Sequence, residues 1–228
     1  MKTVKSLLLN KSRKRILLID DHPITRYGLT QLINHQPDLV VCGEAGSALQ
    51  ALGVVQSLQP DLVLVDLTLP GKSGLEFIKD MQALHPALAV LAVSMHDESV
   101  YAERVLRAGA RGYIMKNEGG ERLLEAIRQV LLGQVYISKS MSATILDVLT
   151  RRRPSPTDSR PGSLTDREFE IFQLIGQGLS TREIGLQLSL SVKTVETHRQ
   201  HIKDKLNVRS GPKLIQEAVR WAATQQLV

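Results

Sequence analysis

Between residues 15 and 133 the chain alternates short apolar runs with longer amphipathic segments, and this alternation limits the possible folds more than any other feature. Continuous apolar runs are typical of strands buried on both faces, as in Leu62-Val63-Leu64-Val65. Five such βα units predict an α/β fold with a doubly wound, five-stranded parallel sheet and right-handed crossovers. The runs lie near residues 15–20, 38–43, 61–65, 88–94 and 111–115, and the following segments begin near Pro23, Ser47, Gly74, Glu98 and Gly120.

Chain length and composition restrict the class of protein further. The 228 residues, of which 43% are hydrophobic, are enough for two domains with ordinary cores. The single cysteine, Cys42, excludes a disulfide framework and a cysteine-rich zinc site. No apolar run approaches the ~18 residues needed to span a bilayer, and the basic N-terminus lacks the pattern of a signal peptide. We therefore expect a cytoplasmic protein with no membrane partner.

The net charge of +6 is distributed unevenly along the chain. Residues 1–15 hold six Lys or Arg and no acid, whereas residues 16–134 hold nine basic and 14 acidic residues. The excess of positive charge outside this acidic region hints at a nucleic-acid partner. The basic arm could add nonspecific attraction to phosphates, or it could be a disordered tail or a misassigned start. Both interpretations of the arm remain open.

Four regions differ in composition, and we interpret them as separate parts of the chain. Residues 1–14 form the basic arm, residues 15–134 the α/β domain, residues 135–162 a linker and residues 163–228 an all-α domain. The second half of the linker is rich in Pro, Ser and Arg and contains almost no large apolar residues. Before it, residues 138–150 could form one short helix.

The C-terminal region has only helical periodicity. Thr165 and Ser180 are each followed three residues later by a glutamate, which is the capping-box pattern of a helix start. We expect Ser191 and Ser210 to cap two further helices. Residues 163–228 therefore predict four short helices, of which the second and third form a helix-turn-helix.

Polar residues follow four of the predicted strands at the points where the strands end. Asp20 and Asp21 follow the first strand, Asp66 the third, Ser94 the fourth and Lys116 the fifth. The carboxyl ends of parallel strands meet at one edge of the sheet, where such folds bind their ligands. Three carboxylates at one point need a hard cation, and oxygen ligands without thiolates favour Mg²⁺.

Each of these residues alone also has an ordinary structural explanation. Asp20 and Asp21 could cap the helix that begins near Pro23. Asp66 could be a turn residue at the end of a strand, and Lys116 could be a solvated side chain. The interpretation as a site depends on the ordered set and not on any single residue.

The acid pair, the central aspartate followed by Pro70-Gly71, the hydroxyl and the lysine resemble response-regulator receiver domains in order and spacing. The resemblance implies a flavodoxin-like fold with Asp66 as the phosphoacceptor. It implies that Mg²⁺ is bound by Asp66, directly by Asp21, partly through water by Asp20, and by the backbone carbonyl of Thr68.

The resemblance also implies roles for the other strand-end residues. Lys116 would supply positive charge to the phosphoryl oxygens, and Ser94 would donate a hydrogen bond to them. Tyr113 would then swing inward, changing the face formed by the fourth helix, fifth strand and fifth helix. His22 and His96 flank the site, and we interpret them as peripheral because receiver chemistry needs no histidine of its own.

The helix-turn-helix of residues 180–189 and 191–206 has one apolar and one polar side. Apolar residues at helical spacing predict one core stripe, formed by Ile184, Leu188, Val192, Val195, Ile202 and Leu206. On the polar side, hydroxyls, an amide and cations suit base edges and phosphates, and Glu196 can accept a hydrogen bond from the amino group of cytosine. We therefore expect DNA contacts from Lys193, Thr194, Glu196, Thr197, Gln200 and Lys203. The alternative is a helical protein-interaction domain with a solvated polar face.

Residues 164–206 resemble the LuxR-type DNA-binding domain, which implies a dimer on inverted or direct half-sites with the last helix, about residues 212–223, as the dimer surface. At position 185 this chain has glycine where the family usually has alanine. Glycine within a helix costs about 1 kcal/mol of stability relative to alanine. Gly211-Pro212 departs at the start of the last helix, where proline is tolerated. The resemblance is carried by Leu164, Thr165, Arg167, Glu168, Gly178, Glu183, Ile184, Leu188, Ser191, Thr194, Val195, Glu196, His198, Ile202, Lys205 and Leu206.

Together the two halves predict a response regulator of the NarL/FixJ type. A sensor histidine kinase would transfer a phosphoryl group to Asp66 in a Mg²⁺-dependent reaction. The phosphorylated chain would form a homodimer and bind double-stranded promoter DNA. The protein would therefore regulate transcription and would not be an enzyme.

Two alternatives come from other classes of protein. A Mg²⁺-dependent phosphatase of the haloacid-dehalogenase type also uses a strand-end aspartate, but that family has a second aspartate two residues later, where this chain has Thr68. A DNA-binding protein that works without phosphorylation would use the receiver only for dimerisation. Such a protein would not need the intact set of Asp20, Asp21, Asp66, Ser94 and Lys116.

Overall fold

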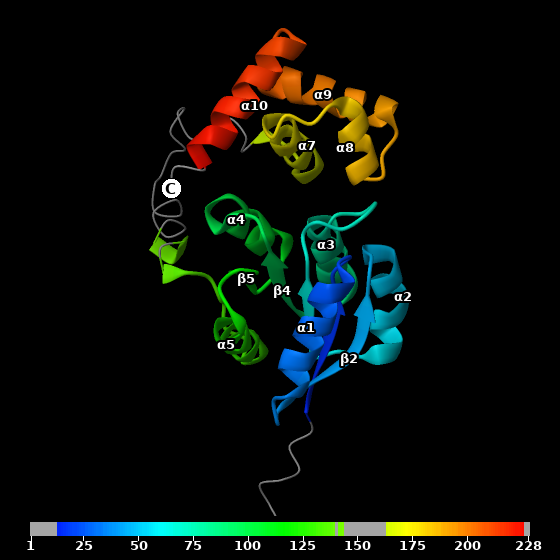
Figure 1. Ribbon diagram of the computed structural model, residues 1–228. Helices are drawn as coiled ribbons and strands as arrows, with labels where there is room; N and C mark the ends of the chain where they lie inside the picture. The colour runs from blue at the N-terminus through cyan, green and yellow to red at the C-terminus, as the bar shows by residue number, and fades with distance from the viewer. Residues whose placement is uncertain (1–12, 140, 144–162, 226–228) are drawn as a thin grey trace, which may run out of the picture. The chain divides into compact units, whose positions relative to one another are not determined.

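The computed structural model describes residues 13–139, 141–143 and 163–225 (Figure 1). The chain divides into two compact units, Met1–Ser138 and Lys139–Val228, and each is described by itself. The predicted basic arm and most of the predicted linker, including most of its short helix, lie outside the described residues. The predicted domain limits therefore stay predictions. None of the described helices is long and apolar enough to cross a membrane.

The first unit contains a five-stranded parallel sheet with the strand order β2-β1-β3-β4-β5 (Figure 1). This arrangement confirms the predicted doubly wound α/β fold. The strands are β1 (Lys14–Ile19), β2 (Leu39–Ala45), β3 (Leu62–Val65), β4 (Ala89–Ser94) and β5 (Gly112–Met115). The helices that follow them are α1 (Pro23–Asn34), α2 (Ala48–Leu58), α3 (Gly74–Leu84), α4 (Glu98–Ala108) and α5 (Gly120–Leu131).

Helices cover both faces of this sheet, which is why its strands are apolar on both sides. On one face, alternate strand residues such as Leu18, Leu64 and Leu91 join α1 and α5 in one apolar cluster. Strand residues of the opposite parity, such as Leu17 and Val63, are buried toward α2, α3 and α4. The strand ends are therefore fixed between two packed layers.

The strand order places the ends of β1 and β3 side by side. Ile19 pairs with Val65, so the next residues, Asp20 and Asp66, are neighbours at the carboxyl edge. The Asp66 N–H donates to the Ile19 carbonyl at 2.8 Å. The connection after β1 leads to β2 on one side of the sheet, whereas the connection after β3 leads to β4 on the other side. Between two connections that diverge in this way lies a crevice in which such folds bind ligands.

Residues 163–225 of the second unit contain four helices: α7 (Asp166–Gly176), α8 (Thr181–Gln187), α9 (Val192–Lys205) and α10 (Gly211–Gln225). The predicted caps are confirmed by their hydrogen bonds. Thr165 and Ser180 form capping boxes, and the Ser191 side chain accepts the backbone N–H of Thr194. Ser210 Oγ accepts the N–H of Lys213 at 3.4 Å.

The predicted core stripe of the helix-turn-helix is confirmed at all but one position. The buried members are Ile184, Leu188, Val195, Ile202 and Leu206. Val192 is 46% exposed, so its assignment to the stripe is wrong. Val192 is the first residue of α9, and contact with the core begins only one turn later at the fully buried Val195.

Gly185 has a structural role that helix propensity alone does not indicate. A Cβ atom at this position would lie 2.8 Å from the backbone oxygen of Leu190, in the turn between α8 and α9. The Leu190 N–H in turn donates to the Gly185 carbonyl at 2.8 Å. Glycine therefore allows this turn to approach the helix backbone closely, which offsets its propensity cost.

Asp38 and Arg128 connect the start of β2 to α5 through two hydrogen bonds. Arg128 Nε lies 2.9 Å from Asp38 Oδ2, and Arg128 Nη2 lies 3.0 Å from Asp38 Oδ1. The hydrogen bond from Arg128 holds the pKa of the Asp38 carboxyl below its usual value. Because both side chains are more than 40% exposed, solvent limits what this pair contributes to stability.

We predict that Asp38→Asn lowers the free energy of unfolding by about 0.5–1 kcal/mol near neutral pH. A carboxyl whose pKa is lowered by folding stabilises above its unfolded pKa, and this contribution is lost as the pH falls through the folded pKa. The difference between the two proteins should therefore vanish in acid. Urea unfolding at several pH values, followed by tyrosine absorbance, measures it. A difference that stays constant from neutral to acidic pH would contradict the assignment.

Candidate functional site

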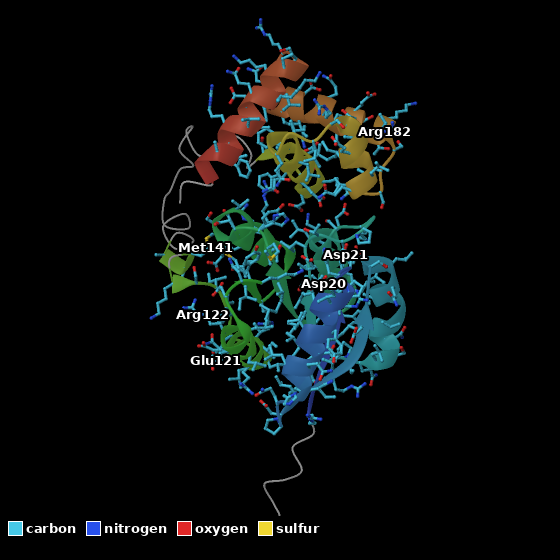
Figure 2. The ribbon with its side chains drawn as sticks, viewed as in Figure 1. Asp20, Asp21, Glu121, Arg122, Met141 and Arg182 are labelled. Carbon is cyan, nitrogen blue, oxygen red and sulfur yellow. The ribbon has the colours of Figure 1, made fainter. Side chains whose placement is uncertain are left out.

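Two buried carboxylates and a half-buried lysine form the centre of the site at the carboxyl edge of the sheet. Lys116 Nζ lies 2.6 Å from Asp20 Oδ2 and 2.7 Å from Asp66 Oδ2. Asp20 and Asp66 are only 3% and 4% exposed. Asp20 and Asp21 lie where β1 ends and α1 begins (Figure 2). The structure thus brings together residues that are 96 and 50 positions apart in the sequence.

Burial and ion pairing act against each other at this centre. Burial raises the pKa of the Asp66 carboxyl above its usual value, although Lys116 acts in the opposite direction. Burial acts to lower the pKa of Lys116, but the carboxylates of Asp66 and Asp20 outweigh it and the pKa is raised. The lysine is therefore firmly charged, and it faces two carboxylates. One negative charge remains poorly compensated among these three groups, which favours a second cation.

Asp21 lies at the exposed rim, where His22 connects it to Asp20. His22 Nδ1 lies 2.8 Å from Asp21 Oδ1 and 3.2 Å from Asp20 Oδ1. The backbone N–H of His22 also donates to Asp20 Oδ1 at 2.8 Å. The N-cap of α1 is His22, without a side-chain hydrogen bond, so the acid pair does not cap this helix. His22 is thus in contact with both acids.

The residues present fit a hard divalent cation. One ligand atom each from Asp20, Asp21, His22 and Asp66 lies within 4.8 Å of the others. Three of these four donors are carboxylates, which suits Mg²⁺. The Thr68 backbone is adjacent, because its N–H donates to Asp66 Oδ1 at 3.1 Å.

Ser94 and Tyr113 are connected through the backbone of His96. Ser94 Oγ accepts the His96 N–H at 3.3 Å, and the Tyr113 hydroxyl donates to the His96 carbonyl at 2.6 Å. Tyr113 is fully buried and therefore already points inward, and burial raises the pKa of its hydroxyl. The His96 ring lies 3.1 Å from Thr68 Oγ1 and stacks on Tyr101 at a centroid distance of 4.7 Å.

These contacts give His96 a more central position than the sequence indicated. Burial lowers the pKa of its ring, so the ring is neutral near pH 7 and can form a hydrogen bond with Thr68. No residue pattern marks His96 in the sequence. Only the folded loop after β4 places it between the aspartate loop and the buried Tyr113.

Gly74 is a second residue that the sequence did not identify as part of the site. Its N–H donates to the Leu67 carbonyl at 2.9 Å. A Cβ atom here would lie 2.0 Å from the backbone oxygen of Asp66 and 2.7 Å from Leu67 Cα. Glycine therefore allows the start of α3 to pack directly against the loop that carries the aspartate.

The six residues predicted to contact DNA all lie on α9 and are exposed or half-buried. Thr194 Oγ1 lies 2.7 Å from Ser191 Oγ, and Thr197 Oγ1 donates to the Lys193 carbonyl at 3.0 Å. Gln200 Nε2 donates to Asp204 Oδ1 at 2.9 Å. The polar groups on this side of α9 are therefore oriented by local contacts along the helix.

Helix α10 has one side packed on the unit and one side exposed. Leu214 and Ala218 are fully buried, and Trp221 lies edge-on to Phe169 of α7 at a centroid distance of 5.3 Å. Ile215 and Val219 are 44% and 46% exposed. These two residues form an apolar strip on the outer side of the helix.

Comparison with known proteins identifies the family. The family of the response regulator receiver domain matches residues 16–128, and that of bacterial regulatory proteins, luxR family, matches residues 162–218. The oxygen regulatory protein NreC of Staphylococcus carnosus (strain TM300) is 36% identical over 210 residues, which cover 90% of this chain and 97% of NreC. The chain belongs to the LuxR-type response regulators. Members of this family are phosphorylation-controlled transcription regulators that bind DNA through a helix-turn-helix, and this chain contains both parts.

Solved structures agree with this assignment. A two-component response regulator of the LuxR family from Aurantimonas sp. SI85-9A1 is 35% identical, with a TM-score of 0.57, and covers 61% of this chain and 100% of its own. RcsB from Salmonella enterica serovar Typhimurium, bound to promoter rprA, has a TM-score of 0.61 over 90% of this chain and 97% of its own. At 22% identity, RcsB supports the fold alone.

We predict that Gly74→Ala destabilises the receiver by about 1–3 kcal/mol, because the new methyl group has backbone on its near side and cannot be accommodated by a side-chain shift. All four tyrosines of the chain lie in the first unit, which contains the receiver, whereas the single tryptophan, Trp221, lies in the second unit. Urea unfolding followed by tyrosine absorbance therefore isolates the receiver.

Gly53→Ala is the matched control for this substitution. Gly53 lies within α2, and a Cβ atom there would meet no atom within 4 Å. This variant should be stabilised by up to about 1 kcal/mol through helix propensity. Equal stability of the two variants would show that the close approach at Gly74 does not limit the fold.

Proposed function

We propose that Asp66 accepts a phosphoryl group from a sensor histidine kinase and that this modification controls DNA binding by α9. The observation that carries the proposal is the buried carboxylate of Asp66 at the crevice of the sheet, with Lys116 Nζ 2.7 Å from its Oδ2. A carboxylate is a usable nucleophile toward phosphorus.

The transfer step follows from these positions. An oxygen of Asp66 forms a bond to the phosphorus of a phosphohistidine while the phosphorus–nitrogen bond breaks and the histidine nitrogen leaves. Lys116, held between Asp66 and Asp20, offsets charge on the transferring oxygens. Because Lys116 contacts the Oδ2 atom of each acid, it also fixes their orientation before transfer.

Asp20, Asp21, Asp66 and the carbonyl of Thr68 would hold Mg²⁺. When bound, the cation offsets the negative charge that accumulates as a phosphate approaches carboxylates. The chain leaves suitable atoms for it, because Lys116 occupies only the Oδ2 atoms of Asp20 and Asp66. Asp21 is the most exposed of the three acids and would be a direct ligand at the rim.

Ser94, His96 and Tyr113 would report phosphorylation to the surface formed by α4, β5 and α5. The Ser94 hydroxyl would turn to donate to the phosphoryl group, changing its contact with the His96 N–H. Tyr113 is bound to the carbonyl of the same residue, so a shift of the loop would alter the packing of Tyr113. This coupling would favour a dimer of receivers.

Helix α9 would read promoter DNA, with Lys193 on a phosphate and Thr197 and Gln200 at base edges. The exposed strip of Ile215 and Val219 on α10 supports a second dimer contact near the DNA. A dimer would place two α9 helices on two half-sites. RcsB, a protein of the same fold, has been solved bound to the promoter rprA.

Incubation with acetyl phosphate and Mg²⁺ should add one phosphoryl group to the full chain, detectable by intact-mass spectrometry. Asp66→Asn should abolish the label, and Lys116→Met should slow its formation on the order of 100-fold, the usual effect of removing one group that stabilises developing charge. Asp61→Asn is the matched control, because Asp61 lies at the opposite end of β3 and should leave labelling unchanged.

Two results would contradict the proposal. Equal labelling of wild type and Asp66→Asn would place the phosphoryl group elsewhere. Steady release of phosphate from many substrates would favour the phosphatase alternative.

Chelation of Mg²⁺ should abolish labelling of the wild type, because the charge at the site would then remain uncompensated.

Substitutions on α9 test the DNA interface. Lys193→Ala should weaken binding to all sequences and reduce the slope of log affinity against log salt by about 1, whereas Thr197→Ala and Gln200→Ala should each relax specificity at single positions by about 1–3 kcal/mol. Lys79→Ala, on α3 of the receiver, is the control for loss of one positive charge. Footprints that are unchanged in all three α9 variants would contradict the recognition-helix assignment.

A further inference from the structure

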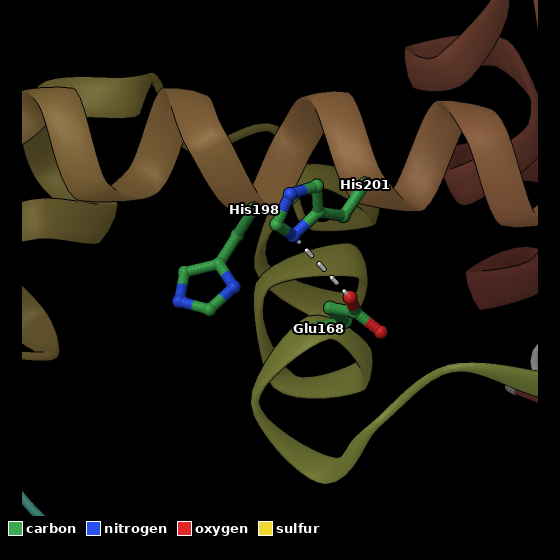
Figure 3. Close-up of side chains that lie close together, drawn as sticks. All are labelled: Glu168, His198 and His201. Atoms are coloured by element: carbon green, nitrogen blue, oxygen red, sulfur yellow. Dashed lines mark ion pairs between the residues drawn. The ribbon is translucent and has the colours of Figure 1, made fainter.

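A second group of metal-ligating side chains lies in the DNA-binding unit, where the proposed function does not use it. Glu168 of α7 faces His198 and His201 of α9 (Figure 3). One ligand atom from each residue lies within 4.8 Å of the other two. The two imidazole rings are nearly perpendicular, with centroids 6.5 Å apart.

The fold explains why these three side chains converge. His198 and His201 are three residues apart on α9 and therefore share one side of the helix. Glu168 is 3% exposed at the third position of α7, where its Oε2 accepts the Thr165 N–H at 2.8 Å in the capping box. Its other oxygen, Oε1, lies 3.9 Å from His201 Nδ1. The carboxylate is thus fixed on the inner side, with one oxygen turned to the histidines.

We propose that Glu168, His198 and His201 bind a borderline transition-metal ion, with Zn²⁺ as the reference ion. Two imidazoles and one carboxylate suit zinc, which takes three protein ligands and a water in open sites, and they do not suit Mg²⁺. In a tetrahedral zinc site the ligand atoms lie about 3.4 Å apart, given metal–nitrogen distances of about 2.0–2.1 Å. The His201 side chain is 56% exposed and therefore has room to rotate toward this spacing.

Lys205 limits how tightly the ion binds. Its Nζ lies 2.6 Å from Glu168 Oε2, so one cation already contacts the carboxylate on the side away from the histidines. A competing interpretation is an ion pair between Glu168 and protonated His201. The two differ in one respect: an ion pair needs only His201 and a proton, whereas the metal needs neutral rings and both histidines.

Metal binding would connect α7 to α9, the helix proposed to read DNA. The ion would restrain α9 through the side chains of His198 and His201, which share one side of the helix. Binding to the folded state alone would also raise the stability of this unit in proportion to the logarithm of free metal concentration. The site is distinct from the carboxylate site of the receiver, whose donors are mainly oxygens.

Titration of the full chain with Zn²⁺ by isothermal calorimetry tests the proposal. Wild type should bind one Zn²⁺, and His201→Gln should abolish this binding or weaken its affinity at least about tenfold. Even residues that only hydrogen-bond to a metal ligand contribute about 10–100-fold to metal affinity. His35→Gln, at the C-terminal end of α1, is the matched control for loss of a histidine. His22→Gln removes a donor from the receiver site and should leave the zinc event in place.

Thermal unfolding followed by Trp221 fluorescence gives a second measurement in the same unit. Zn²⁺ should raise the unfolding midpoint of wild type and of His22→Gln but not that of His201→Gln, and Mg²⁺ should raise none of them. Lys205→Met should bind Zn²⁺ more tightly than wild type, since it removes the competing cation. Zinc binding of unchanged affinity in His201→Gln, loss of zinc binding in His22→Gln, or no zinc binding by wild type would overturn the proposal.

Discussion

The ammonium group of Lys116 is the interaction on which the receiver site depends. It lies 2.6 and 2.7 Å from two carboxylates that end different strands and are almost fully buried. Without it, two like charges would share a site from which water is largely excluded, which is strongly unfavourable. With it, one negative charge still remains uncompensated, so the same arrangement that allows the site to fold also makes it attractive to a divalent cation. The parallel sheet makes this contact possible, because the ends of β1, β3 and β5 lie at the same edge. Lys116, which follows β5, therefore reaches the acids that follow β1 and β3.

The features that could be predicted from the sequence are those with local or periodic signals. Continuous apolar runs indicated the five strands, since the sheet is covered on both faces, and hydroxyl–glutamate spacings indicated where α7 and α8 begin. The convergence of Asp20, Asp66 and Lys116 followed from topology, because strand ends in a parallel sheet share an edge. The sequence was sufficient for these features because the apolar runs and the caps recur along the chain. The position of the site follows because all strands of a parallel sheet end at the same edge.

The features that could not be predicted depend on contacts between segments distant in the chain. His96 looked peripheral because no pattern shows that its loop folds over Thr68. Gly74 looked like an ordinary helix start, although the Asp66 carbonyl leaves no room for a side chain. Val192 fitted the helical period, but periodicity does not reveal where along α9 the packing begins. In each case the missing information is the distance between two backbones.

The two groups of metal-ligating side chains in the described residues share one arrangement and differ in one property. In each, a lysine contacts one oxygen of a buried acid and does not contact the other, Lys116 for Asp66 and Lys205 for Glu168. The ligand groups near this second oxygen then decide the preferred ion: further carboxylates in the receiver, imidazoles between α7 and α9. A hard ion in the first site would act on phosphoryl transfer, whereas a borderline ion in the second would act on how firmly α9 is held. The proposed dimerisation would change how many copies of α9 reach the DNA, whereas restraint by an ion would change how firmly each copy is held.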